Sequence, residues 1–222
     1  MDEELRCWIY ASLAEIFADV PRDLEPPPAG PDMEAPARQA VAAVCEALRS
    51  ESAEDVAADH VRLFVNAPGG VPAPPYAGWY LDGALGGASR AHVAEAYARQ
   101  CLEVAEDAGQ PADSIATELE FLHLLCRHQL AARTTNDAPA FAAARDAEAA
   151  FLLGHFCRWV PRFASAIRDA APGPVFGSVA ELLACLCTEA ERLTRALPGG
   201  SAGPAMGAMD RSVHTDRSHR RA

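Results

Sequence analysis

The chain has 222 residues, half of them hydrophobic, and a formal net charge of −12 at pH 7. This length and apolar content suffice for one sizeable folded domain or two small ones, and they argue against a chain that is disordered throughout. The acidic balance disfavours binding to nucleic acids, whose phosphates it would repel, and favours a partner that is basic or of mixed charge.

The first part of the chain is expected to form three helices. Apolar residues recur at helical spacing over residues 3–18 and again over residues 33–49. The sequence SAED, residues 52–55, is typical of a capping box and predicts a third helix, which carries Val56, Val61 and Phe64.

A segment rich in proline and glycine, residues 66–88, follows these helices. Three prolines in its sequence VPAPPYAGWYLDG disfavour a helix, because proline lacks an N–H group and restrains the residue before it. We therefore expect a stiff, non-helical loop that presents three large aromatic side chains, Tyr76, Trp79 and Tyr80.

Helical spacing returns after this loop. Ser89 is expected to cap a long helix that Gly109 closes, and a second helix is predicted over residues 113–132. Asp137 starts the next predicted helix, which ends at Pro161.

A short helical piece over residues 162–170 precedes the last predicted helix, which a capping box at Ser178 and Glu181 opens. No segment alternates with a period of two, so the sequence predicts an all-α fold. We expect one bundle-like domain of about seven to ten helices over residues 1–197. Residues 198–222 are rich in Gly, Ser and Arg without apolar periodicity, which predicts a disordered tail.

The seven cysteines show no framework spacing, and their odd number argues against a secreted disulfide scaffold. The first residues are acidic, whereas a secretory signal begins basic and continues apolar. No apolar run approaches the roughly 20 residues that a membrane span needs. These features predict a protein of the reducing cytoplasm without stable membrane insertion. We expect either a monomer or a dimer.

The motifs of a phosphate-binding loop, a nucleophilic serine or a zinc protease are missing, so no enzyme is predicted. His123 and Cys126 lie one helical turn apart, but a structural zinc site needs four converging ligands. We favour cysteines that pack as small hydrophobic residues, with no metal and no cofactor. Glu118 and Glu120 could act as general acid and base only if they converged in a pocket, and a solvated helix surface is the favoured interpretation.

Three segments in order carry a resemblance to a known family. They are LFVNAPGGVPAPPYAGWYLDG (residues 63–83), GQPADSIATELEFLHLL (residues 109–125) and FLLGHFCRWVPRF (residues 151–163), which ends in the pattern W-x-P-x-F. Their order and spacing resemble the TorD/DmsD/NarJ family of cytoplasmic chaperones for molybdenum-containing redox enzymes. The resemblance covers roughly residues 5–195.

The resemblance implies a system-specific chaperone. Members of this family are all-helical, bind the twin-arginine signal peptide of a partner enzyme and hold that enzyme back from export while its cofactor is inserted. The implied partner is the catalytic subunit of a molybdoenzyme of the DMSO-reductase type, together with its signal peptide. The residues expected to bind this client are Tyr76, Trp79, Tyr80, Asp82, Asp113, Ser114, Glu118 and Phe121.

In this interpretation the aromatic side chains offer preorganised apolar area, and Asp82, Asp113 and Glu118 accept hydrogen bonds from the peptide arginines. The alternative is that the aromatics are buried core anchors that hold the loop against the helices. Two positions depart from the family pattern: Gly78 stands where serine is usual, and Ser114 stands where histidine is usual. Two other function classes stay open, a helical adaptor for another protein partner and a small helical hydrolase.

Overall fold

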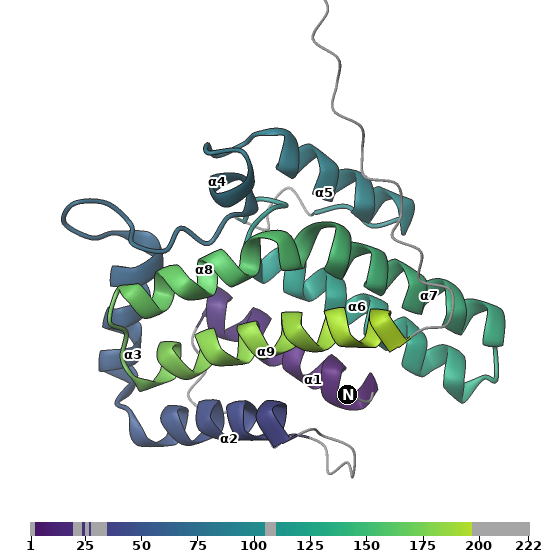
Figure 1. Cartoon of the computed structure of the whole chain (residues 1–222), viewed down its shortest axis with the longest axis horizontal. Helices are drawn as coiled ribbons and strands as arrows, with labels where there is room; N and C mark the ends of the chain where they lie inside the picture. Colours follow the sequence, from purple (N-terminus) through teal and green to yellow (C-terminus); the bar gives the residue numbers. More distant parts are fainter. Residues whose placement is uncertain (1–2, 20–23, 25–26, 28–34, 105–109, 197–222) are drawn as a thin grey trace, which may run out of the picture.

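Helices provide all the regular secondary structure in the part of the chain that the computed structural model describes, residues 3–19, 24, 27, 35–104 and 110–196 (Figure 1). Their bounds are α1 Glu3–Ala18, α2 Ala35–Ser50, α3 Ala53–His60, η1 Val61–Val65, α4 Ala77–Leu81, α5 Ala88–Arg99, α6 Ile115–Thr134, α7 Ala138–Phe151, η2 Leu152–Phe156, α8 Cys157–Asp169 and α9 Pro174–Ala196. The segments η1 and η2 are single π-helical turns. The all-α prediction is confirmed, and the predicted tail over residues 198–222 lies outside the described residues.

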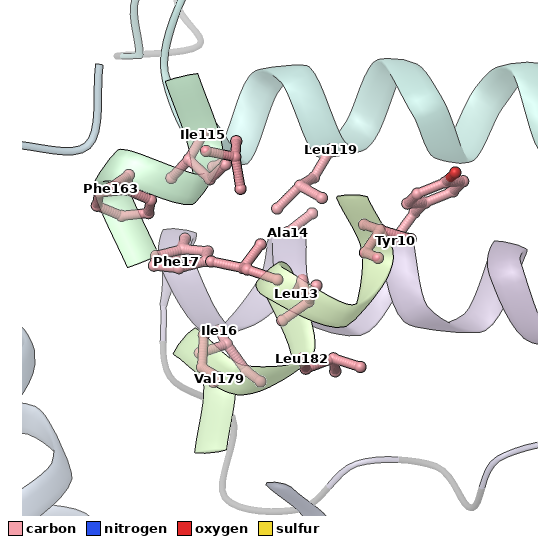
Figure 2. Close-up of a cluster of buried hydrophobic side chains, with 14 of the residues drawn as sticks. Tyr10, Leu13, Ala14, Ile16, Phe17, Ile115, Leu119, Phe163, Val179 and Leu182 are labelled. Carbon is pink, nitrogen blue, oxygen red and sulfur yellow. The ribbon is translucent and has the colours of Figure 1, made fainter. Parts of the chain in front are cut away.

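Helix α1 forms the centre of the hydrophobic core. It packs most extensively along α6, while α2 and α8 pack on α9, and α7 packs on α6. Figure 2 shows Leu13 and Phe17 of α1 among side chains from α6, α8 and α9, including Leu119, Phe163 and Leu182. A helix that buries apolar residues on several sides must be covered by its neighbours, which explains why the sequence of α1 is so rich in them.

Helix α5 is shorter than the sequence predicts. It ends at Arg99, and Cys101 has a φ of 57°, in the left-handed region that side chains other than glycine rarely adopt. Residues 101–104 therefore leave the helix and run toward α6. Residues 105–109, where Gly109 was expected to close the helix, lie outside the described residues.

Pro161 does not end its helix, because α8 continues through it to Asp169. A proline ring in a helix clashes with the carbonyl four residues earlier, which here belongs to Cys157. Cys157 has a ψ of −5°, far from the helical value of about −42°, and directly follows the π-helical turn η2. This distortion turns the Cys157 carbonyl away from its usual direction and makes room for the ring.

Helix α9 begins at Pro174, so Ser178 and Glu181 lie within the helix and the predicted capping box is wrong. A proline at the first helical position lacks the N–H group that would otherwise need a hydrogen-bond partner. The carboxylate of Glu51 accepts a hydrogen bond from the backbone N–H of Val175 at 3.0 Å. A cap supplied by a residue distant in sequence cannot be read from the local pattern.

A buried polar network joins α1, α6 and α7. Arg6 donates to both carboxylate oxygens of Glu148, at 3.0 and 3.2 Å. Tyr10 and Gln129 donate to the same carboxylate, at 2.8 and 2.6 Å. A buried ion pair of this kind is costly to break because the attraction between the two charges no longer offsets the cost of removing the remaining charge from water.

We expect Glu148→Gln to lower the free energy of unfolding by about 3 kcal/mol or more, since it removes the buried carboxylate that accepts from Arg6, Tyr10 and Gln129. The matched control is Glu46→Gln, which removes a carboxylate from an exposed pair with Arg49 and should cost less than about 1 kcal/mol. Urea unfolding of the three proteins measures both values. Equal stability of the Glu148→Gln variant and the wild type would contradict a structural role for this network.

Candidate functional site

Trp79 and Tyr80 lie on the short helix α4, so the prediction of a wholly non-helical loop is wrong. The prolines of this segment all precede α4 and therefore do not interrupt it. Tyr80 is buried, and its ring stacks on Trp159 of α8 with the ring centroids 5.7 Å apart. Trp79 lies on another side of α4 and is 48% exposed. Core anchoring thus describes Tyr80, whereas Trp79 is available at the surface.

Two backbone hydrogen bonds fasten the segment before α4 to the segment before α6. The N–H of Ala77 donates to the carbonyl of Asp113 at 2.9 Å, and the N–H of Ile115 donates to the carbonyl of Pro75 at 2.9 Å. The result is an isolated antiparallel bridge. Its two sides belong to the first and second sequence motifs, so the structure brings these distant motifs together.

The two departures from the expected motifs lie at this bridge. The N–H of Gly78 donates to the Asp113 side chain at 3.2 Å, and a Cβ at residue 78 would lie 2.8 Å from the carbonyl oxygen of Ala84. Residue 78 must therefore be glycine for the backbone to approach this closely. Ser114 caps α6, since its hydroxyl accepts the N–H of Thr117 at 3.2 Å.

Glu118 is a fully buried carboxylate in the first turn of α6, with 0% exposure. The indole N–H of Trp159 donates to one oxygen at 3.0 Å, and Nε2 of His155 lies 2.8 Å from the other. Burial raises the pKa of Glu118 above its ordinary value, while the contact with His155 acts in the opposite direction. The favoured interpretation of a solvated helix surface is therefore wrong for Glu118, although Glu120 is exposed. The two glutamates do not converge in one pocket.

Asp82 is exposed, but its carboxylate already has partners at the start of α5. It accepts the backbone N–H of Ser89 at 2.9 Å and the Ser89 hydroxyl at 3.0 Å. Asp82 thus supplies the cap that Ser89 was expected to provide, and it ties α5 to the end of α4.

The predicted site residues divide into an outer and an inner group. The outer group is exposed or partly exposed and consists of Tyr76, Trp79 and Asp82. The inner group is buried and consists of Tyr80, Asp113, Ser114, Glu118 and Phe121. In this arrangement the inner residues shape and support the surface, and the outer residues offer most of the area that solvent reaches.

His155 and Trp159 are the important residues that sequence reasoning did not assign to the site. A signal for them exists, because Glu118 falls on the apolar stripe of α6 between Ile115 and Leu122. A carboxylate on a buried stripe requires hydrogen-bond donors from a neighbouring helix. Trp159, in the W-x-P-x-F pattern, is one of those donors.

His123 and Cys126 do not share a metal site. His123 Nδ1 lies 3.0 Å from the carbonyl oxygen of Cys7, and the Cys126 thiol donates to the carbonyl of Glu3 at 3.1 Å. Within the described ranges, no group of three or more His, Cys, Asp or Glu side chains is arranged to hold a metal ion. The helices of these ranges include none that is both long and apolar enough to cross a bilayer.

Comparisons with known proteins bear on this arrangement. The model of the family described as nitrate reductase delta subunit matches residues 30–165. The fold is similar to a solved structure from Archaeoglobus fulgidus titled a "putative redox enzyme maturation protein", with a TM-score of 0.50 and 18% sequence identity. That similarity covers 83% of this chain and 93% of the other. No curated protein matches this chain.

We expect Glu118→Gln to keep the free energy of unfolding at pH 7 within about 1.5 kcal/mol of wild type, because an amide can accept from Trp159 and donate to His155. Glu118→Ala leaves both partners unpaired beside a cavity and should cost about 3 kcal/mol or more.

The pH dependence of the same variants has a defined sign. Since the pKa of Glu118 is raised in the folded protein, protons bind the folded state more tightly than the unfolded one. Wild type should therefore gain stability relative to Glu118→Gln as the pH falls from 7 toward the ordinary pKa of glutamate. Chemical unfolding across this range measures the difference, and a gain with rising pH instead would contradict the assignment.

Proposed function

Since the chain belongs to the nitrate reductase delta subunit family, a family of redox-enzyme maturation chaperones, we propose that it binds the twin-arginine signal peptide of a molybdoenzyme catalytic subunit. The client is of the DMSO-reductase type. The chaperone holds it in the cytoplasm while the molybdenum cofactor is inserted and then releases it for export or assembly. It catalyses no reaction itself.

The observation that carries this proposal is the exposed Trp79 on a rigid base. Its neighbour Tyr80 is fixed by stacking on Trp159, and the segment before α4 is fixed by the bridge to residues 113–115. Leu85, 62% exposed, adds apolar area in the connection between α4 and α5. Apolar area that is already ordered loses little entropy when a peptide covers it, which favours binding.

The charge of the chain supports a ligand that carries arginines. A signal of the twin-arginine type combines a pair of arginines with an apolar stretch. The formal net charge of −12 attracts the arginines, while the exposed aromatic and aliphatic side chains suit the apolar stretch. Both halves of the ligand thus have a counterpart on one protein.

We expect Trp79→Ala to weaken binding of such a peptide about tenfold or more, because it removes an aromatic anchor from the interface. The melting temperature should change little, since almost half of the indole is already exposed. Val65→Ala is the control, as Val65 is 59% exposed on η1, a different segment. Fluorescence anisotropy of a labelled peptide measures the affinities, and an unchanged affinity in a folded Trp79→Ala protein would remove α4 from the site.

The arginines of the peptide should contribute through charge. Replacing both with glutamine is expected to lower the affinity and to flatten its dependence on salt concentration, since screening acts on charged partners. Titrations at low and high salt with the two peptides measure this. Equal affinities and equal salt slopes would show that the acidic residues do not read the arginines.

A further inference from the structure

The carboxylates expected to receive the peptide arginines are not free to do so. Asp113 and Glu118 are buried, and each already has hydrogen-bond partners within the protein. Asp82 is exposed, but both of its oxygens accept hydrogen bonds at the start of α5. If the protein binds the arginines of the peptide, other carboxylates must pair with them.

Two adjoining cavities lie between α5, residues 101–104 and α6. The first has a volume of about 590 Å³ and follows α5 from Gly86 and Gly87 toward Ala98. The second has a volume of about 450 Å³ and lies along the first half of α6. They share one wall, which consists of Tyr97, Leu102, Glu103 and Val104.

The second cavity combines free carboxylates with an apolar floor. Glu103 and Glu120 line it, are exposed, and have no hydrogen bond or ion pair with any described residue. Phe121 and Leu124 supply apolar lining from α6. Burial raises the pKa of Tyr97 in the shared wall, and nearby negative charges that include Glu120 raise it further. The negative charge of Glu120 therefore acts on the wall between the cavities.

We infer that the second cavity is the guanidinium-binding subsite, in which Glu103 and Glu120 pair with the two arginines of the peptide, and that the first cavity receives the adjacent apolar residues. This inference rests on the proposed function. It assigns the arginine pair and the apolar stretch of the peptide to two different cavities. A guanidinium group in the second cavity can bond a carboxylate while its alkyl stem covers the apolar floor.

The first cavity suits an apolar segment because the side of α5 that faces it carries small residues. Ala91, Ala94 and Ala98 recur there at helical spacing and leave room over the helix. Arg90 lines the other end, about 12 Å along the helix axis from Ala98. Its positive charge, which no described residue pairs, repels the arginines and sets the direction of the peptide.

In this direction the apolar stretch leaves the first cavity at Gly86, next to the exposed Leu85 and near the helix that carries Trp79. The free carboxylates, the alanine surface and the exposed aromatic side chain then follow one another in the same order as the parts of a twin-arginine signal. This order explains how the carboxylates that pair with the arginines and the aromatic side chain that contacts the apolar stretch can bind one peptide without contacting each other.

The test uses the full chain and a synthetic peptide with an Arg-Arg pair followed by about a dozen Leu and Ala residues. The Glu103→Gln/Glu120→Gln variant should bind this peptide about tenfold more weakly than wild type, with most of the salt dependence lost. A second peptide, with both arginines replaced by glutamine, should bind the variant and wild type alike. Ala94→Gln, which fills the first cavity, should weaken both peptides.

The control is Glu4→Gln/Glu54→Gln, which changes the net charge equally at exposed glutamates on α1 and α3 and should leave the affinity within about twofold of wild type. A variant at residues 103 and 120 that binds the arginine peptide as tightly as wild type overturns the subsite but leaves the proposed function standing. Failure of wild type to bind the peptide overturns both. Since all four glutamates are exposed, circular dichroism should show unchanged folding.

Discussion

The two backbone hydrogen bonds between residues 75–77 and residues 113–115 hold the candidate site in place. Helix α4 has only five residues, and a helix this short is not stable without tertiary contacts. The bridge fixes its start, and the burial of Tyr80 fixes its inner side. Helix α5 depends in turn on α4, because Asp82 at the end of α4 caps it. Without the bridge, Trp79 and the walls of both cavities would lose their common base.

Buried polar contacts between α6 and α8 stabilise the segment that carries Trp79. Burying the carboxylate of Glu118 is unfavourable by itself, and hydrogen-bond partners from η2 and α8 offset that cost. Trp159 performs two tasks at once, since its indole N–H bonds Glu118 and its ring stacks on Tyr80. Helices α4, α6 and α8 are thereby joined through one side chain. A surface supported in this way is ordered before a ligand arrives, which lowers the entropy cost of binding.

The sequence predicts the fold well where the signal is periodic and local. The helix over residues 3–18, the caps at Ser52 and Asp137, and the all-α class are all confirmed, because apolar spacing and capping side chains act over a few residues. The errors occur where distant residues decide. Helix α8 continues through Pro161 because the backbone at Cys157 is distorted. Helix α9 begins before the predicted capping box because Glu51, which is distant in the sequence, caps it.

The candidate site was predictable in location but not in detail. The motifs around Trp79 and Asp113 point to two segments that the structure joins. Residue type alone could not show that Asp113 is buried, because both a surface acceptor and an interior one are carboxylates. Glu103 lies outside the three motifs, Glu120 was expected on a solvated helix surface, and only the position of residues 102–104 beside α6 shows that both line one cavity.

We propose that the surface formed by α4, α5 and the start of α6 binds an arginine-containing signal peptide. Amide hydrogen exchange of the full chain, measured with and without the twin-arginine peptide, tests it most directly because it maps binding without any substitution. Saturating peptide should slow exchange in residues 77–104 and 113–124 and leave exchange in α2 and α9 unchanged. Slower exchange confined to α2 and α9, with the peptide bound, would contradict it.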